Sequence, residues 1–218
     1  EMCIRDSASA NLGLSNPLGL GDQLLNNFVA SQGSDYARSA YSLPVGYDGW
    51  RAGVHTSYLH YQLVGSFAAL GATGSAATMG LDASYPLLRS VSENISFNAA
   101  LDHKRYRNLA LSSAGASGPA AVVSDYPIQA LSLSLSGNSV DSWGAGAFWG
   151  GGGSNTWGLN LVHGSVNLNG SPNQASDAQA ANTQGDYAKL MLNASRQQAL
   201  SSSWSLYAAA TVQGATHN

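Results

Sequence analysis

Charge is what this 218-residue sequence has least of. Only 10% of its residues are Asp, Glu, Lys or Arg, compared with about 25% in a typical soluble domain. Lysine occurs only at Lys104 and Lys189. The mean hydropathy is still close to zero, at −0.09, so small neutral polar residues take the place of charges. The formal net charge of −3 gives no indication of a nucleic-acid partner.

Long apolar runs and cysteine are also scarce. No stretch approaches the roughly 18 apolar residues of a transmembrane helix, so a membrane-spanning form of this chain would have to use β-strands. The single cysteine, Cys3, lies in residues 1–7. These residues resemble the translated end of a sequencing adapter, and we exclude them from fold prediction as a scar. The remaining 8–218 contain no cysteine, which suits assembly from the periplasm.

Apolar and small polar residues alternate in blocks of about ten residues. Leu131, Leu133 and Leu135 are separated by serines, and Leu206 and Val212 belong to a similar block. A period of two places every second side chain on one face of a strand. The other face then carries Ser, Asn, Thr, Gln and Gly, which is typical of a barrel with lipid outside and water inside. A soluble all-β sandwich also alternates and is the alternative, but the low charge and the polar inner face favour the barrel.

The pattern predicts ten antiparallel strands in one barrel domain. We expect them at residues 8–15, 22–31, 35–43, 49–62, 74–85, 93–108, 126–136, 156–168, 185–196 and 202–214. Short turns are expected at 16–21, 44–48, 86–92, 137–141 and 197–201, and longer segments at 63–73, 109–125 and 169–184. Short turns on one side and long loops on the other are typical of an outer-membrane barrel. The register of residues 142–155 stays open.

Aromatic residues favour the same fold. Trp50, Val54 and Tyr58 share one face of their predicted strand, whereas Arg51 and His55 point the other way. From Trp50 to Tyr58 a tilted strand climbs roughly 20 Å, close to the apolar band of about 25 Å between two aromatic girdles. Tyr85, Trp157 and Trp204 also stand at predicted strand ends.

Three ordered turn motifs resemble a known family. They are Asn16-Pro-Leu-Gly-Leu-Gly-Asp22, Tyr41-Ser-Leu-Pro-Val-Gly-Tyr-Asp-Gly49 and Ser84-Tyr-Pro-Leu-Leu-Arg89. In them Gly and Pro set tight turns, and we expect Pro44 and Pro86 to end strands because proline cannot donate to the ladder. From about residue 11 onward the chain resembles the TpsB transporters of two-partner secretion, the haemolysin secretion/activation proteins of the ShlB/FhaC/HecB type.

The resemblance implies a transporter in the outer membrane of a Gram-negative bacterium. Such proteins have a 16-stranded barrel after two periplasmic POTRA domains, and they export one large haemolysin or adhesin, a TpsA-type exoprotein, without ATP. On that plan the strand at 8–15 is the second and the strand at 202–214 the eleventh. We therefore expect the POTRA domains, plug helix, first strand, last five strands and the sixth loop, with its Val-Arg-Gly-Tyr tip, to lie outside this sequence. A passive porin or a structural surface barrel is the alternative.

Charged residues supply the candidate sites. The candidates for lining the lumen are Arg38, Arg51, His55, Asp82 and Lys189, which could border a wet pore or form salt bridges on the inner wall. The densest cluster is expected at the outer rim and comprises Asp102, His103, Lys104, Arg105 and Arg107. It could contact lipopolysaccharide phosphates or the exported protein, or it could be a solvated rim.

Motifs of catalysis and metal binding are missing. The sequence has no Gly-x-Ser-x-Gly elbow, no Gly-x-Gly-x-x-Gly and no His-Glu-x-x-His. His55 and His60 are expected on opposite faces of one strand, where they cannot share a metal ion. We therefore predict neither enzymatic activity nor a cofactor nor a metal site.

Overall fold

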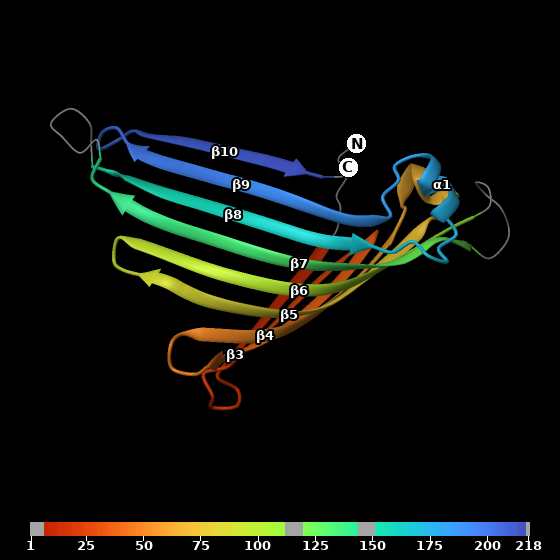
Figure 1. Cartoon of the computed structure of the whole chain (residues 1–218), viewed down its shortest axis with the longest axis horizontal. Coiled ribbons are helices and arrows are strands. Elements are labelled where there is room, and N and C mark those ends of the chain that lie inside the picture. Colours follow the sequence, from red (N-terminus) through yellow and green to blue (C-terminus); the bar gives the residue numbers. More distant parts are fainter. Residues whose placement is uncertain (1–6, 112–119, 144–150, 217–218) are drawn as a thin grey trace.

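The described part of the chain forms one antiparallel sheet of ten strands (Figure 1). The computed structural model describes residues 7–111, 120–143 and 151–216. The strands are β1 (Ser7–Ser15), β2 (Gln23–Ser31), β3 (Ser34–Val45), β4 (Trp50–Gln62), β5 (Thr73–Arg89), β6 (Glu93–Ala110), β7 (Ala121–Asp141), β8 (Gly153–Val166), β9 (Gly185–Ala199) and β10 (Ser205–Ala215). Each pairs with the next along the chain, which confirms the predicted meander.

The connections alternate between the two ends of the sheet. The turns after β1, β3, β5 and β9 lie at one end, called here the turn end. The other end carries the 3₁₀ helix η1 (Gly65–Leu70) and the helix α1 (Gln174–Gln179) (Figure 1), and is called the loop end. A tight turn between β2 and β3 also lies there. The predicted separation of short turns from residues 63–73 is confirmed.

Several strands are longer than predicted. The turn expected at residues 137–141 is wrong, because these residues belong to β7 and pair with β8 as far as Asp141 opposite Gly153. Both margins of the loop expected at 109–125 are strand, in β6 and β7; residues 112–119 lie outside the described part. Of the segment 142–155, whose register was open, residues 153–155 belong to β8 and 144–150 are not described.

The expectation that Pro44 and Pro86 end their strands is also wrong. Pro44 pairs with Arg51 inside β3, and Pro86 pairs with Ser96 inside β5. Both prolines lie beyond the last residue that pairs with the preceding strand, since β2 pairs with β3 only as far as Ser42 and β4 with β5 only as far as Ser84. A residue with one neighbouring strand needs one set of ladder bonds, so proline is tolerated there.

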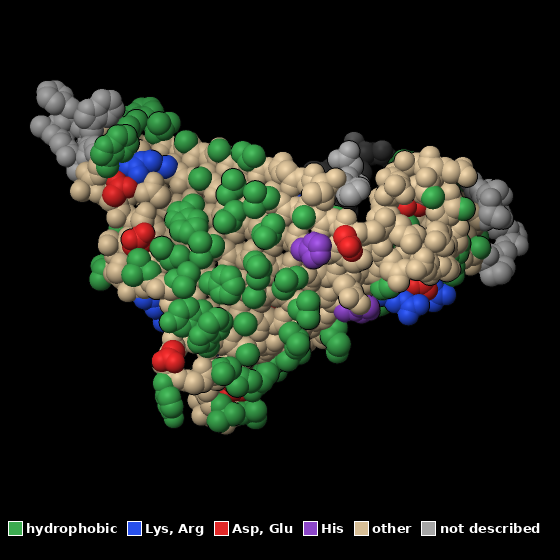
Figure 2. Space-filling model, in the orientation of Figure 1, with side chains coloured by type: hydrophobic (Ala, Val, Ile, Leu, Met, Phe, Trp, Pro, Cys, Tyr) green, Lys and Arg blue, Asp and Glu red, His purple; other side chains and the backbone are tan. Residues whose placement is uncertain are grey.

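The apolar side chains cover the outside of the sheet rather than a core. Among the described residues only Ala130 and Leu168 are buried hydrophobic residues. The register places Leu131, Leu133, Leu135, Leu206 and Val212 on one face, as predicted. Figure 2 shows hydrophobic side chains spread over this face. No helix in the described part of the chain is long and apolar enough to cross a membrane.

The described structure begins inside the segment excluded from fold prediction. Ser7 is the first residue of β1 and pairs with Ser31. The expected scar at 1–7 therefore includes one residue of the sheet, and its other residues, 1–6, lie outside the described part.

Candidate pore wall

Strand alternation places the five candidate lumen residues on the polar face of the sheet. Arg51 and His55 alternate with the outward Trp50 and Val54 along β4, and Asp82 lies opposite Gly53 of that strand. Arg38 lies opposite Ser57, and Lys189 lies opposite Val162. The structure brings only some of the five into contact: neither Arg38 nor Lys189 forms an ion pair within residues 7–111, 120–143 and 151–216.

His55 lies between two carboxylates in the middle of this face. Its Nδ1 is 2.9 Å from Asp82 Oδ1, and its Nε2 is 3.1 Å from Asp102 Oδ1. Lys104 Nζ is 3.3 Å from the other oxygen of Asp102. The imidazole is buried, at 7% exposure. The chain of contacts Asp82–His55–Asp102–Lys104 ties β4, β5 and β6 together. We call it the inner-wall network.

Two glycines make the inner-wall network sterically feasible. A Cβ atom on Gly80 would lie 2.5 Å from both Asp102 Oδ1 and His55 Cε1, so the imidazole can lie flat over β5 only because residue 80 has no side chain. Gly53 provides the same space for the carboxylate of Asp82. The sequence contains both glycines, but only the register shows that each lies under a charged neighbour.

Arg51 connects the inner face to the first turn. Its guanidinium donates to the carbonyl oxygen of Gly21 at 3.3 Å, and to the backbone oxygen and the hydroxyl of Ser42 at 3.3 and 3.1 Å. Arg51 thereby joins β4 to β3 and to the turn between β1 and β2. It stabilises the turn end as well as contributing charge to the wall.

Asp22 closes the same turn, and sequence analysis did not single it out. It is completely buried and accepts hydrogen bonds from the Tyr41 hydroxyl at 2.9 Å and from the amides of Leu18 and Leu20 at 3.3 and 3.4 Å. Burial by itself raises the pKa of this carboxyl, but the hydrogen bonds from Tyr41 and the backbone outweigh it and hold the pKa below its usual value. The position of Asp22 at the end of a Pro- and Gly-rich turn was the signal available in the sequence.

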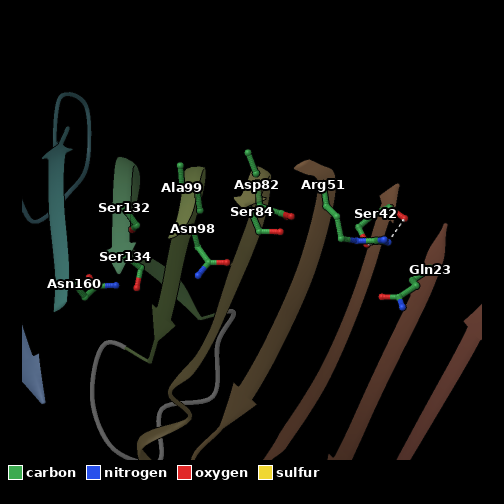
Figure 3. A pocket seen from close by; sticks show the side chains of 12 residues that line it. Gln23, Ser42, Arg51, Asp82, Ser84, Asn98, Ala99, Ser132, Ser134 and Asn160 are labelled. Atoms are coloured by element: carbon green, nitrogen blue, oxygen red, sulfur yellow. Dashed lines mark hydrogen bonds between the residues drawn. The ribbon is translucent and has the colours of Figure 1, made fainter. Parts of the chain in front are cut away.

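A polar hollow of about 470 Å³ opens on the inner face beside Arg51. Figure 3 shows Arg51 reaching toward Ser42, while the amide and hydroxyl groups of neighbouring strands point into the same space. Its polar lining includes Gln23, Ser84, Asn98, Ser132, Ser134 and Asn160. Hydroxyl and amide groups both donate and accept hydrogen bonds, so this surface can solvate water or a passing polypeptide without demanding one sequence.

The rim cluster expected at residues 102–107 is divided between the two faces. Asp102 and Lys104 point inward and belong to the inner-wall network. His103, Arg105 and Arg107 occupy the alternate positions on the outward face. There, Arg105 Nε and Nη2 donate to the two carboxylate oxygens of Asp125 at 2.8 and 3.1 Å, and Arg107 Nε lies 3.9 Å from Asp125 Oδ2.

Further polar contacts organise the loop end. The Tyr61 hydroxyl donates to Asn108 at 2.6 Å, and Asn108 donates to Ser124 at 2.8 Å. Ser171, in the segment between β8 and β9, accepts a bond from the Asp125 amide at 2.9 Å. This segment therefore rests against β7. Sequence analysis missed these contacts, because nothing local to Ser171 indicates its partner.

A meander with an apolar outer face, a polar inner face and turns separated from loops is the wall of a transmembrane β-barrel. Residues 5–217 match the family described as Haemolysin secretion/activation protein ShlB/FhaC/HecB. The chain belongs to this family, whose place is the outer membrane of Gram-negative bacteria.

Two solved structures share the fold. CdiB from Escherichia coli has a TM-score of 0.70 at 18% identity, over 97% of this chain and 37% of CdiB. BamA from Haemophilus ducreyi, lacking POTRA domains 1–3, has a TM-score of 0.55 at 16% identity, over 97% of this chain and 38% of that chain. The chain thus spans well under half the length of either. No curated protein matches it.

Within the residues that the structure describes, no group of three or more His, Cys, Asp or Glu side chains is arranged to hold a metal ion. The family is described as one of haemolysin secretion and activation proteins.

Proposed function

We propose that the full-length parent of this chain is an outer-membrane transporter that secretes, and activates, a large exoprotein of the haemolysin or adhesin type by two-partner secretion. The observation that carries this proposal is the family match over residues 5–217. The partner is a secreted TpsA-type protein. A wall of small hydroxyl and amide side chains supports the proposal, because it leaves a wet path that favours no particular side chain of a moving polypeptide.

This segment would supply part of a 16-stranded barrel and none of the modules that select the partner. In this proposal the POTRA domains and the sixth loop belong to other parts of the parent protein. The share of CdiB that the chain covers, 37%, is consistent with a partial barrel. Outer-membrane lipid, including lipopolysaccharide, would contact the outward face, which carries exposed apolar residues such as Leu101 and Leu131.

A secretion assay on the full-length parent tests the proposal. Cells that express it with its cognate exoprotein should release that protein into the medium, and deletion of the transporter should abolish release. Arg51→Ala and Lys189→Ala should alter assembly or pore conductance more than secretion, because they change the wall and not the recognition modules.

Two results would count against this account. Unchanged release after deletion would contradict the transporter function. Loss of secretion by Arg51→Ala or Lys189→Ala, with normal barrel assembly and normal conductance, would contradict the passive role of the wall.

A further inference from the structure

We propose that His103, Arg105 and Arg107, called here the outward basic stripe, bind the phosphate-bearing headgroup of a lipid in the outer leaflet. The inference deepens the proposed contact with outer-membrane lipid, on which it rests, and it is independent of secretion. It names a site and a chemical group for a contact that would otherwise be only apolar.

The stripe lies where an outer-leaflet headgroup would be. Phe97, near the turn end, and Arg105 are on the same outward face of β6. Between them the strand rises roughly 20 Å, at about 3.4 Å per residue and a tilt of about 40°. The apolar band of such barrels is about 25 Å tall. Arg107, two residues further along, is at roughly 26 Å. Arg107 therefore reaches the loop-end margin of the band and Arg105 lies just inside it, where charged side chains are better tolerated than at the midplane.

A hollow adjoins the stripe on the same side. It has a volume of about 430 Å³ and is lined by His103, Arg105, Asp125, Pro127, Asn169 and Gly170. Its walls come from β6, from β7 and from the segment after β8, which is anchored by a hydrogen bond of 3.1 Å from the Asn167 amide to the Pro127 carbonyl. A headgroup would thus enter a recess with walls rather than rest on a flat strand.

Asp125 orients the arginines without occupying all their donors. Arg105 uses Nε and Nη2 on Asp125, and its Nη1 has no hydrogen-bond partner among the described residues. The side chains of Arg105 and Arg107 are 65% and 53% exposed. Two guanidinium groups and one carboxylate leave one net positive charge. Planar guanidinium groups suit phosphate oxygens because they donate two parallel hydrogen bonds.

The neighbouring side chains favour a lipid over free phosphate. Met79 lies directly opposite His103 on β5 and is 68% exposed, and Leu101, two residues before His103, is 56% exposed. A lipid whose acyl chains lie against Met79 and Leu101 can place its phosphate at the outward basic stripe, and so contacts both. Lys104 stands between stripe residues in the sequence but points to the inner face, so it cannot take part.

Lipid binding by the purified full-length parent tests the site. The probes are bis-phosphorylated lipid A and the same lipid without its phosphates, with retained lipid measured by native mass spectrometry. Unmodified protein should bind the phosphorylated lipid about ten-fold more tightly or better, a difference expected for one or two charge-assisted hydrogen bonds. The variant R105Q/R107Q should lose most of this preference. Lys104→Gln removes one positive charge from the inner face of the same strand, where the double variant removes two from the outer face, and should stay within about two-fold of the unmodified protein.

Equal binding of the two lipids by unmodified protein would overturn the inference, and this comparison needs no variant that might misfold. An equal loss in Lys104→Gln would overturn it too, since the effect would then be one of total charge. Displacement of the lipid by inorganic phosphate at comparable concentration would indicate a free-anion site instead. Binding of the dephosphorylated lipid would still support the general contact of the outward face with lipid, so failure of the phosphate site and failure of that contact are distinguishable.

Discussion

A Cβ atom on Gly49 would lie 3.2 Å from Cγ of Pro86, and one on Gly21 would lie 3.2 Å from Cγ of Pro44. The last glycine of each of these two turns therefore packs against a proline in the stretch of a later strand that pairs with one neighbouring strand only. Both glycines have positive φ, 92° and 74°, which side chains other than glycine rarely adopt. The three turn motifs of the sequence thus form one contact series along the turn end.

Gly49→Ala should destabilise the full-length protein by about 1–2 kcal/mol, because alanine is strained at positive φ and its methyl group would press on Pro86. Denaturant unfolding in lipid vesicles measures the change. Gly46→Ala is the matched control, since Gly46 lies in the same turn and also has positive φ, but a Cβ there meets nothing within 4 Å. Equal stability of Gly49→Ala and the control would show that this packing is unimportant.

Gly80→Ala should cost about 1–3 kcal/mol, since the added methyl group displaces the His55 imidazole and leaves the carboxylate of Asp102 without this partner. The sharp test is a double-mutant cycle with His55→Ala. Once the imidazole is gone, the methyl group meets only the Asp102 carboxylate, which is then free of its bond to His55 and can move aside, so the effect of Gly80→Ala should shrink in that background. Additive effects would argue against the inner-wall network.

Asp22→Asn should remove a pH-dependent part of the stability. The folded pKa of Asp22 lies below its usual value, so its ionised form stabilises the fold above the unfolded pKa of about 4. This contribution falls as the pH drops through the folded pKa. The stability difference between unmodified protein and Asp22→Asn should therefore be largest near neutral pH and smaller in acid. A difference that grows in acid would contradict the hydrogen-bond assignment.

Leu131→Arg and Ser132→Arg compare the two faces at one height of the wall. Leu131 lies opposite Leu101 in a central outward row, whereas Ser132 points inward beside the polar hollow. An outward arginine near the bilayer midplane costs about 2–4 kcal/mol, but an inward one meets water. Heat-modifiable gel mobility and denaturant unfolding should show an assembly defect for Leu131→Arg alone. Equal defects would mean that both faces are buried.

The alternation of side chains was sufficient to predict the fold. It gave the meander and the faces of Trp50 and Arg51, since a strand's period is a local property of the sequence. The strand ends were harder to predict. Pro44 lies inside β3 and does not end it. Whether a proline ends a strand depends on how far the neighbouring strand, here β2, extends beside it, and this is a property of two strands together.

The candidate site could be predicted only in part for the same reason. Alternation alone divides Asp102 and Lys104 from Arg105 and Arg107, so the sequence contained that signal although the cluster was treated as one group. The contact of His55 with Asp82 and Asp102 is different. It depends on the register of three strands and on Gly80 lying under the ring, and no pattern within one strand contains that information.

The most direct test of the account is cysteine accessibility along β7 in the full-length parent. With any native cysteine replaced, single cysteines are introduced at outward positions 131, 133 and 135 and at inward positions 132, 134 and 136. They are then treated in intact outer membranes with a water-soluble thiol reagent. The account predicts that the three inward positions react and the three outward ones, facing lipid, do not. Uniform reactivity, uniform protection or the reverse alternation would contradict a barrel wall with a wet inner face.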